Sequence, residues 1–255
     1  MTRLFDLKGR VAVVTGGNGG IGLGMARGLA RAGASLAIAA RDAAKAKGAL
    51  DELRVLGVEA EFVALDVTDE AACRAMAARV EKRFGRLDIL VNNAGINIRR
   101  RPEAYAASEW RAVIETNLTG AFHCAQAVHP AMVRAGGGKI VNVGSMMSLF
   151  GAAVQAPYAA SKGGIVQLTK ALATAWAKDN IQVNAVLPGW IETDLTAAAK
   201  VQVPGLNERV LDRTPAARWG DPADFAGIAV FLASSASDFI TGTAIPVDGG
   251  FSVQG

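Results

Sequence analysis

Short apolar runs alternate with amphipathic stretches along most of the chain. The run at 11–14, Val-Ala-Val-Val, is β-branched and apolar throughout, which is typical of a strand buried on both faces of a parallel sheet. The same pattern predicts strands at 35–40, 61–65, 87–91, 139–143, 181–187 and 244–247. The stretches between them predict helices from the glycine turn to about 32, then at 45–56, 69–84, 104–134, 157–178 and 222–233.

Strict alternation of strands and helices predicts an α/β fold, a doubly wound (Rossmann) parallel sheet of seven strands with helices on both faces. No linker, low-complexity segment or internal repeat divides the chain, so residues 1–255 are expected to form a single domain. Residues 193–217 break the alternation: they are polar and contain Pro204, Gly205 and Pro215. A long segment of this kind is often a lid over an active site; the alternative is a surface excursion with no role.

Composition excludes several classes of protein. Hydrophobic residues make up 51% of the chain, enough for a large core, and the net charge of +4 is spread without a basic stripe beside aromatic residues, so no nucleic-acid partner is expected. No apolar run approaches ~18 residues and the first residues lack an apolar signal core, which predicts a soluble, cytoplasmic protein without membrane contact. Cys73 and Cys124 are expected to be small buried hydrophobes, and His123 and His129 lack the spacing of a metal site.

Tyr158 and Lys162 are the first candidates for chemistry. They stand four residues apart in a predicted helix, and positions i and i+4 share one helix face. A tyrosine has a pKa near ~10, and an ammonium held beside it favours the phenolate, so the pair can exchange a proton near neutral pH. The same spacing also occurs by chance in many helices.

A glycine-rich turn, Thr-Gly-Gly-Asn-Gly-Gly-Ile-Gly at 15–22, lies between the first strand and the first helix. Glycines allow the backbone to approach a pyrophosphate, and the helix N-terminus supplies N–H donors and a positive dipole. The flanking strand and helix are the context in which such a turn indicates a dinucleotide site.

With this turn, the chain resembles the short-chain dehydrogenase/reductase family from about Leu7 to Gly250. Asn-Asn-Ala-Gly at 92–95 matches a family motif, and Pro188-Gly189 with Thr193 matches the turn at the nicotinamide end. The family's catalytic tetrad falls on Asn117, Ser145, Tyr158 and Lys162.

The resemblance implies a role for each tetrad member. Tyr158 would be the general acid in carbonyl reduction and the base in alcohol oxidation, while Lys162 would lower the pKa of Tyr158 and hold the nicotinamide ribose. Ser145 would donate a hydrogen bond to the substrate oxygen, and Asn117 would position a water that connects Lys162 to solvent.

The resemblance also implies a nicotinamide dinucleotide cofactor. Its expected contacts are Gly16, Asn18, Gly20, Ile21, Gly22, Arg41, Asp66, Val67, Asn93, Ala94, Gly95, Tyr158, Lys162, Pro188, Gly189, Ile191 and Thr193. Ala40 stands where NAD-preferring members carry an acid, and Arg41 stands where NADP-preferring members place a guanidinium, so a preference for NADP is predicted. Asp42 is the counter-argument, because its carboxylate is placed to bind the ribose or to neutralise Arg41.

A sugar acid such as a keto-gluconate is the expected substrate, because Arg99 stands where the family's sugar-acid dehydrogenases carry a basic residue. Arg99 would pair with the substrate carboxylate, and Ser145, Met147 and Tyr158 would contact the rest of the molecule. The alternative is that the arginines at 99–101 form a solvated charge run.

Two other functions and an assembly state are open from sequence. A 3-oxoacyl-[acyl-carrier-protein] reductase would share the tetrad and would use the basic run to dock an acidic carrier protein. A non-catalytic dinucleotide-binding protein would usually lack the tyrosine or the lysine, which this chain retains. Relatives commonly form homotetramers through the long fourth and fifth helices and the C-terminal strand region, and the same assembly is expected here.

Overall fold

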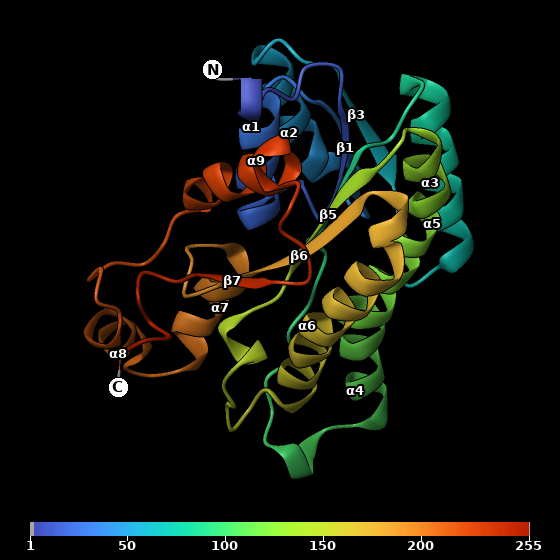
Figure 1. Cartoon of the computed structure of the whole chain (residues 1–255). Coiled ribbons are helices and arrows are strands. Elements are labelled where there is room, and N and C mark those ends of the chain that lie inside the picture. The colour runs from blue at the N-terminus through green and yellow to red at the C-terminus, as the bar shows by residue number, and fades with distance from the viewer. Residues whose placement is uncertain (1–2, 255) are drawn as a thin grey trace.

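The computed structural model describes residues 3–254 and contains one parallel sheet of seven strands in the order β3-β2-β1-β4-β5-β6-β7 (Figure 1). The predicted doubly wound sheet is therefore confirmed. The strands and α-helices are, in chain order, β1 (Val11–Thr15), α1 (Gly20–Arg31), β2 (Ser35–Ala40), α2 (Ala43–Val55), β3 (Ala60–Ala64), α3 (Glu70–Phe84), β4 (Ile89–Asn92), α4 (Ala107–Ile114), α5 (Gly120–Arg134), β5 (Gly138–Val143), α6 (Ala156–Trp176), β6 (Ile181–Pro188), α7 (Asp194–Gln202), α8 (Leu206–Arg213), α9 (Ala226–Ala233) and β7 (Ala244–Val247).

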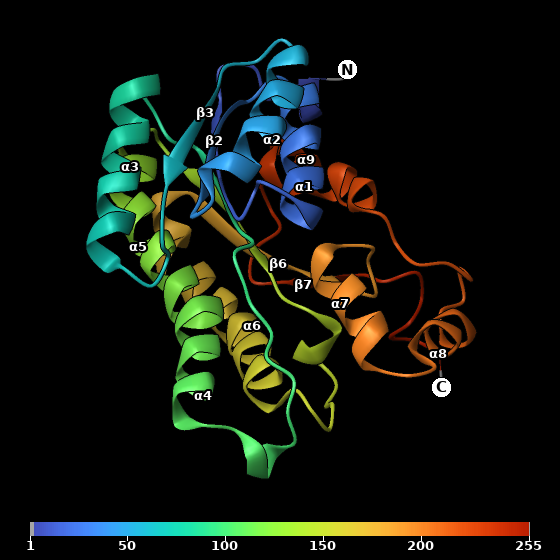
Figure 2. The same ribbon diagram turned by 180° about the vertical axis from the view of Figure 1, so that it is seen from behind.

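Helices cover both faces of the sheet, as Figures 1 and 2 show. On one face, α1, α2 and α9 bury a core that includes Met25, Leu29 and Phe225. On the other face, α3, α5 and α6 bury a second core, in which Cys73 and Cys124 are both inaccessible to solvent. The central strands β1, β4 and β5 are buried at every residue, which explains why their apolar residues are consecutive rather than alternating with exposed polar ones.

Several predicted element ends are wrong by two or three residues. The helix α2 begins at Ala43 rather than at 45 because the Asp42 carboxylate accepts a hydrogen bond from the Lys45 backbone and so acts as its N-cap. The strand predicted at 87–91 lies at Ile89–Asn92, where it pairs with β1 and β5. The single helix predicted at 104–134 begins at Ala107 and is divided into α4 and α5 by one π-helical turn, Glu115–Thr119.

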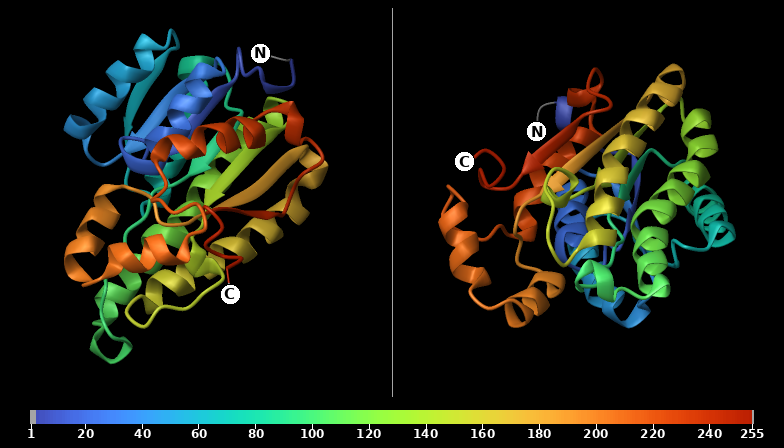
Figure 3. Two further views of the ribbon diagram at one scale, coloured as in Figure 1. Left: turned by 90° about the vertical axis from the view of Figure 1, so that its left-hand side faces the viewer. Right: turned by 90° about the horizontal axis from the view of Figure 1, so that it is seen from below.

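Residues 193–217 contain the two short helices α7 and α8. Figure 3 shows them standing apart from the two helix layers. Thr193 caps α7 by accepting a hydrogen bond from the Thr196 backbone, and Gly205 precedes α8 with a left-handed backbone. The predicted lid therefore has regular structure of its own, while its movement stays a prediction.

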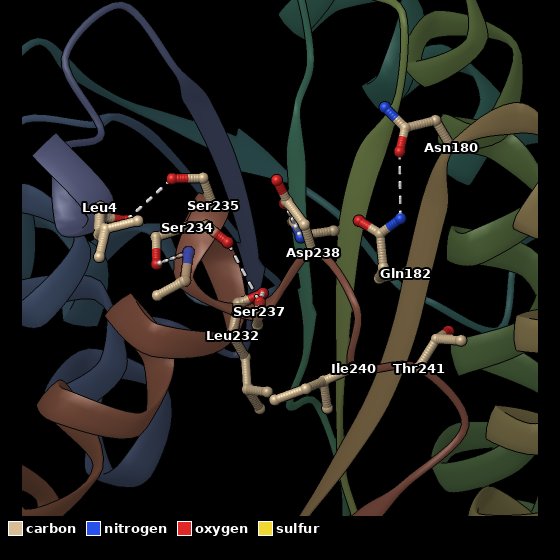
Figure 4. A network of polar contacts seen from close by, with 12 residues as sticks. Leu4, Asn180, Gln182, Leu232, Ser234, Ser235, Ser237, Asp238, Ile240 and Thr241 are labelled. Atoms are coloured by element: carbon tan, nitrogen blue, oxygen red, sulfur yellow. Dashed lines mark hydrogen bonds and ion pairs between the residues drawn. The ribbon is translucent and has the colours of Figure 1, made fainter.

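At the edge where the strands begin, polar side chains hydrogen-bond to nearby backbone carbonyls and to one another (Figure 4). The Ser237 hydroxyl donates to the Leu232 carbonyl, and the Gln182 amide at the start of β6 donates to Asn180 Oδ1 at 3.2 Å. The edge where the strands end is different, because the chain order reverses between β1 and β4 and the loops diverge there. In open α/β sheets, ligands bind at this reversal.

Candidate active site

A cleft of about 460 Å³ lies where strands β1 to β6 end. Nearly all of the residues predicted from sequence line it. They are Gly16, Asn18, Gly20, Ile21, Arg41, Asp66, Val67, Asn93, Ala94, Gly95, Arg99, Ser145, Met147, Tyr158, Lys162, Pro188, Gly189, Ile191 and Thr193. The two exceptions, Gly22 and Asn117, lie behind the cleft wall.

The glycine turn presents bare backbone to the cleft. Gly16 and Gly20 have φ angles of 63° and 51°, which favour glycine, and Gly19 at the N-cap of α1 has no side chain to cap the helix. The N–H groups and positive dipole of the first turn are thus left for an anion such as a pyrophosphate. Gly22 serves packing, because a Cβ there would lie 2.4 Å from Asn93 Nδ2.

Thr15 was predicted only as the first residue of the glycine motif, but its side chain also holds the glycine turn against the loop after β4. Its buried hydroxyl donates to the Val91 carbonyl and accepts hydrogen bonds from the backbone N–H groups of Asn93 and Ala94, at 3.0 and 3.1 Å. Asn93 Nδ2 donates back to the carbonyls of Thr15 and Gly16. These bonds join the glycine turn to the loop after β4; a hydroxyl at the end of an apolar strand was the available signal.

Arg41 lies at the end of the cleft where the adenosine of the cofactor is predicted to bind. Arg41 is exposed, lines the cleft, and has no acidic partner in the part of the chain that the structure describes. Asp42 caps α2, so its carboxylate is engaged away from Arg41. The pKa of Asp66 is lowered, chiefly by hydrogen bonds from the Thr68 backbone and hydroxyl, so its carboxylate is ionised at neutral pH. This set of groups fits a nicotinamide dinucleotide.

Tyr158 and Lys162 lie on α6 with the ammonium 5.7 Å from the centre of the phenol ring. Lys162 Nζ donates to the Val143 carbonyl at 2.7 Å, and burial lowers the pKa of Lys162 to about 8. The pKa of Tyr158 is raised, because burial outweighs the opposing effects of the Ser145 hydroxyl and the Arg99 guanidinium. Burial thus sets the net direction, and Tyr158 is protonated at neutral pH. The expected lowering of the Tyr158 pKa by Lys162 stays a prediction.

Ser145 follows β5 and caps a short 3-10 turn, Met146–Ser148. Its hydroxyl accepts a hydrogen bond from the Met147 backbone at 3.1 Å. That bond uses a lone pair and leaves the hydroxyl proton free to be donated. Ser145 and Tyr158 can thus bind the same substrate oxygen.

Asn117 lies in the π-helical turn between α4 and α5 and is buried. Its side chain accepts a hydrogen bond from the Ile96 backbone N–H at 2.8 Å, and donates to the Ile96 carbonyl at 2.9 Å and to Ser161 Oγ at 3.2 Å. The residue thus fixes the loop after β4 at the cleft. Its predicted role in positioning a water stays a prediction.

The three arginines at 99–101 are not equivalent. Arg100 pairs with Glu109 at 2.7 Å and Arg101 pairs with Glu103 at 2.5 Å, both at the exposed surface. Arg99 is half-buried, lines the cleft, and has no carboxylate partner among residues 3–254. Burial lowers its pKa, although Tyr158 and Tyr105 act in the opposite direction. The solvated charge run describes Arg100 and Arg101, whereas Arg99 is a cation in the site.

The cleft is also lined by residues that were not predicted as site residues, among them Asn97, Gln155 and Trp190. Trp190 packs edge-to-face on Trp219 with ring centres 5.6 Å apart, so the wall formed by the loop after β6 is supported by the chain that follows α8. These positions carry no sequence motif and became visible only when the loops were placed together.

Within residues 3–254, no three His, Cys, Asp or Glu side chains gather in a way that could hold a metal ion. In the same range, no helix combines the length and apolar character needed to cross a bilayer.

Comparison with known proteins agrees with the site. A family profile described as "Enoyl-(Acyl carrier protein) reductase" matches residues 16–252. The chain is 41% identical over 249 residues to 2-dehydro-3-deoxy-D-gluconate 5-dehydrogenase of Formosa agariphila, covering 97% of this chain and 94% of the relative. It is 40% identical to gluconate 5-dehydrogenase of Gluconobacter oxydans, covering 98% of both chains.

Solved structures show the same likeness. A gluconate 5-dehydrogenase from Burkholderia cenocepacia, in complex with NADP and tartrate, superposes with a TM-score of 0.93 at 43% identity over 98% of each chain. The family profile, the curated relatives and this structure all extend over nearly the whole sequence. The chain belongs to the short-chain dehydrogenase/reductase family.

Proposed function

We propose that the protein is an NADP-dependent oxidoreductase that interconverts a secondary alcohol and a ketone on a sugar acid. The observation that carries the proposal is the guanidinium of Arg99, which has no carboxylate partner among residues 3–254 and lines the same cleft as Tyr158 and Ser145. A half-buried cation without a partner is costly unless a ligand neutralises it, and a carboxylate matches a guanidinium in charge and geometry. The names of the relatives, which are sugar-acid dehydrogenases and reductases, support the same substrate class.

The mechanism follows from the protonation states. When bound, the nicotinamide supplies or accepts the hydride. Tyr158 is placed to give its phenolic proton to the ketone oxygen in reduction and to take the alcohol proton in oxidation. Ser145 donates a hydrogen bond to the same oxygen as negative charge develops, and Lys162 supplies a nearby positive charge that stabilises the phenolate left on Tyr158. Asn117 is proposed to connect Lys162 to solvent through a water.

The glycine turn, Asp66, Val67 and the residues after β4 and β6 are proposed to hold the dinucleotide. A preference for NADP rests on Arg41, which is free to bind a 2′-phosphate, and on Ala40, which offers no carboxylate to repel one. NADP is present in the related structure from Burkholderia cenocepacia. The ratio of kcat/KM with NADPH to that with NADH tests the preference, which a ratio below one would contradict.

Activity as a 3-oxoacyl-[acyl-carrier-protein] reductase is less well supported than activity on a sugar acid. Docking of an acidic carrier protein would use the basic run, but Arg100 and Arg101 already pair with Glu109 and Glu103. Initial rates of NADPH oxidation with 5-keto-D-gluconate and with an acetoacetyl thioester separate the two functions. A non-catalytic binding protein would oxidise NADPH with neither substrate.

A lid, an assembly state and a location complete the proposal. Residues 193–217 are proposed to close over the substrate, which limited proteolysis with and without cofactor would test.

A homotetramer is proposed because Trp110 on α4 and Phe122 on α5 are 42% and 39% exposed, and a monomeric mass in solution would contradict it. The free thiols of Cys73 and Cys124 suit the reducing cytoplasm, which cell fractionation would test.

A further inference from the structure

Two side-chain amides lie next to each other in the substrate half of the cleft. Gln155 precedes the first residue of α6, and Asn97 lies in the loop after β4. Asn97 Nδ2 donates to Gln155 Oε1 at 3.3 Å, and both residues line the cleft. Gln155 is only 9% exposed, which is unusual for a glutamine because a buried amide is costly unless both of its polar atoms are hydrogen-bonded.

The hydrogen bonds of this pair are incomplete. Gln155 Oε1 accepts one hydrogen bond, from Asn97, whereas both N–H groups of Gln155 Nε2 remain to be donated. Nε2 makes no hydrogen bond within residues 3–254, and the Gln155 side chain does not cap α6 although it occupies the N-cap position. Asn97 Oδ1 is closed off from solvent and also lacks a partner in that range. Gln155 Nε2 is thus the atom of the pair that can meet a ligand.

The loops that carry the two amides are fixed to each other. The Arg100 backbone N–H donates to the Val154 carbonyl at 3.1 Å. The Tyr105 hydroxyl lies between the same two loops, 2.6 Å from the Ile98 carbonyl and 3.2 Å from the Val154 carbonyl. The amide pair is therefore held in place before any substrate arrives, as a specificity site requires.

We infer that Gln155 binds a hydroxyl group on the carbon chain of the substrate through Nε2, and that Asn97 is the positioning residue that orients its amide. Gln155 is three residues before Tyr158, so the two lie on the same side at the start of α6, and Arg99 is two residues after Asn97. One substrate molecule would then be bound by three residues: its ketone by Tyr158, its carboxylate by Arg99 and a hydroxyl by Gln155. The inference rests on the proposed function and assigns the recognition of a substrate hydroxyl to Gln155.

The test is a comparison of two keto acids, 5-keto-D-gluconate and 4-oxopentanoate, of which the second has a ketone and a carboxylate but no hydroxyl. With Gln155→Met, the KM for 5-keto-D-gluconate is expected to rise roughly tenfold, since a polar hydroxyl would face an apolar side chain, while kcat stays within about twofold. The kinetic constants for 4-oxopentanoate and the Kd for NADPH are expected to stay within about twofold.

Gln182→Met is the matched control, because Gln182 is also 9% exposed but lies at the other edge of the sheet (Figure 4). It is expected to leave the KM for both keto acids unchanged. Asn97→Leu is expected to raise the KM for 5-keto-D-gluconate selectively, and to add little to it in the Gln155→Met background, because the two residues act through one amide.

Two contrary outcomes are distinguishable. Wild-type turnover of both keto acids, combined with equal effects of Gln155→Met on both or on neither, overturns this inference and leaves the proposed function intact. Absence of wild-type turnover with any hydroxylated keto acid, with either nicotinamide cofactor, overturns the proposed function and this inference together.

Discussion

The edge of the sheet where the strands begin and the edge where they end differ in how many of their charged side chains form ion pairs. Where the strands begin, Asp88 is buried but pairs with both Arg10 and Arg86, and Lys139 pairs with Asp238 at 2.7 Å. Where the strands end, Arg41, Arg99 and Lys162 have no carboxylate partner among residues 3–254. The paired charges at the first edge stabilise the fold, whereas these three cations at the second edge are available to a ligand, although Lys45 in the same cleft pairs with Asp194.

The pKa shifts of Asp88 and Lys162 show the same difference between the two edges. The pKa of Asp88 is lowered although burial alone would raise it, because two guanidinium groups and the Val11 backbone N–H hydrogen-bond to its carboxylate. Lys162 has no such compensation, and burial lowers its pKa to about 8. A buried charge that the fold does not neutralise costs stability, and that cost is typical of residues retained for function.

Among substitutions at the edge where the strands end, removal of the Tyr158 hydroxyl should lower kcat the most. Tyr158→Phe is expected to lower kcat by roughly 10²- to 10⁴-fold, because the general acid is lost while the ring is kept. The Kd for NADPH, measured by fluorescence titration, should change by less than about threefold. Turnover close to that of the wild type would exclude Tyr158 as the acid.

Lys162→Met and Asp88→Asn should move stability in opposite directions. Lys162→Met is expected to abolish turnover and to raise the free energy of unfolding by up to about 3 kcal/mol at neutral pH, because a buried ammonium is removed. Asp88→Asn is expected to lower that free energy by about 3 kcal/mol, because Arg10 and Arg86 lose their anion, and to leave kcat nearly unchanged. Urea unfolding of the three proteins measures both effects.

The pH dependence of these differences gives a second check. The pKa of Lys162 is about 8 when folded against 10.5 as the ordinary value, so the cost of burying its charge is complete below pH 8 and fades as the pH rises toward 10.5. The gain from Lys162→Met should fade over the same window. The pKa of Asp88 is lowered, so its contribution is present above about pH 4, where a free aspartate ionises, and is lost as the pH falls. A gain from Lys162→Met that grows above pH 8 would contradict the account.

Arg99→Met and Arg100→Met compare a free arginine with a paired one. Arg99→Met is expected to raise the KM for 5-keto-D-gluconate by roughly 10- to 100-fold, because a charge-assisted bond to the carboxylate is lost. Arg100→Met removes a surface ion pair with Glu109 and should change the KM by less than about twofold. Equal effects of the two substitutions would remove the carboxylate role of Arg99.

Arg41→Ala should have the smallest effect, confined to one cofactor. The kcat/KM with NADPH is expected to fall roughly tenfold, while the value with NADH stays the same or rises, because an exposed guanidinium contributes a modest charge-assisted bond. Lys47→Ala on α2, the helix that begins two residues after Arg41, is a control, since Lys47 is exposed and does not line the cleft. A matching fall with both cofactors would mean that Arg41 does not read the 2′-phosphate.

The parts of the site that could be predicted are those fixed by backbone geometry. A buried strand followed by glycines and a helix has one local arrangement, so the place of the glycine turn between β1 and α1 could be predicted from local sequence, while its binding of a phosphate stays a prediction. The net direction of the Tyr158 pKa shift could not be predicted from the spacing to Lys162, because it depends on how deeply the side chain is buried. Thr15 and Gln155 were missed because their partners are contributed by distant parts of the chain.

The substrate and cofactor specificity of the wild-type enzyme tests the proposed activity on sugar acids with NADP. We expect kcat/KM for 5-keto-D-gluconate with NADPH to exceed, by at least about tenfold, both the value for an acetoacetyl thioester with NADPH and the value for 5-keto-D-gluconate with NADH. A higher value for the thioester, or no oxidation of NADPH with any hydroxylated keto acid, would contradict it.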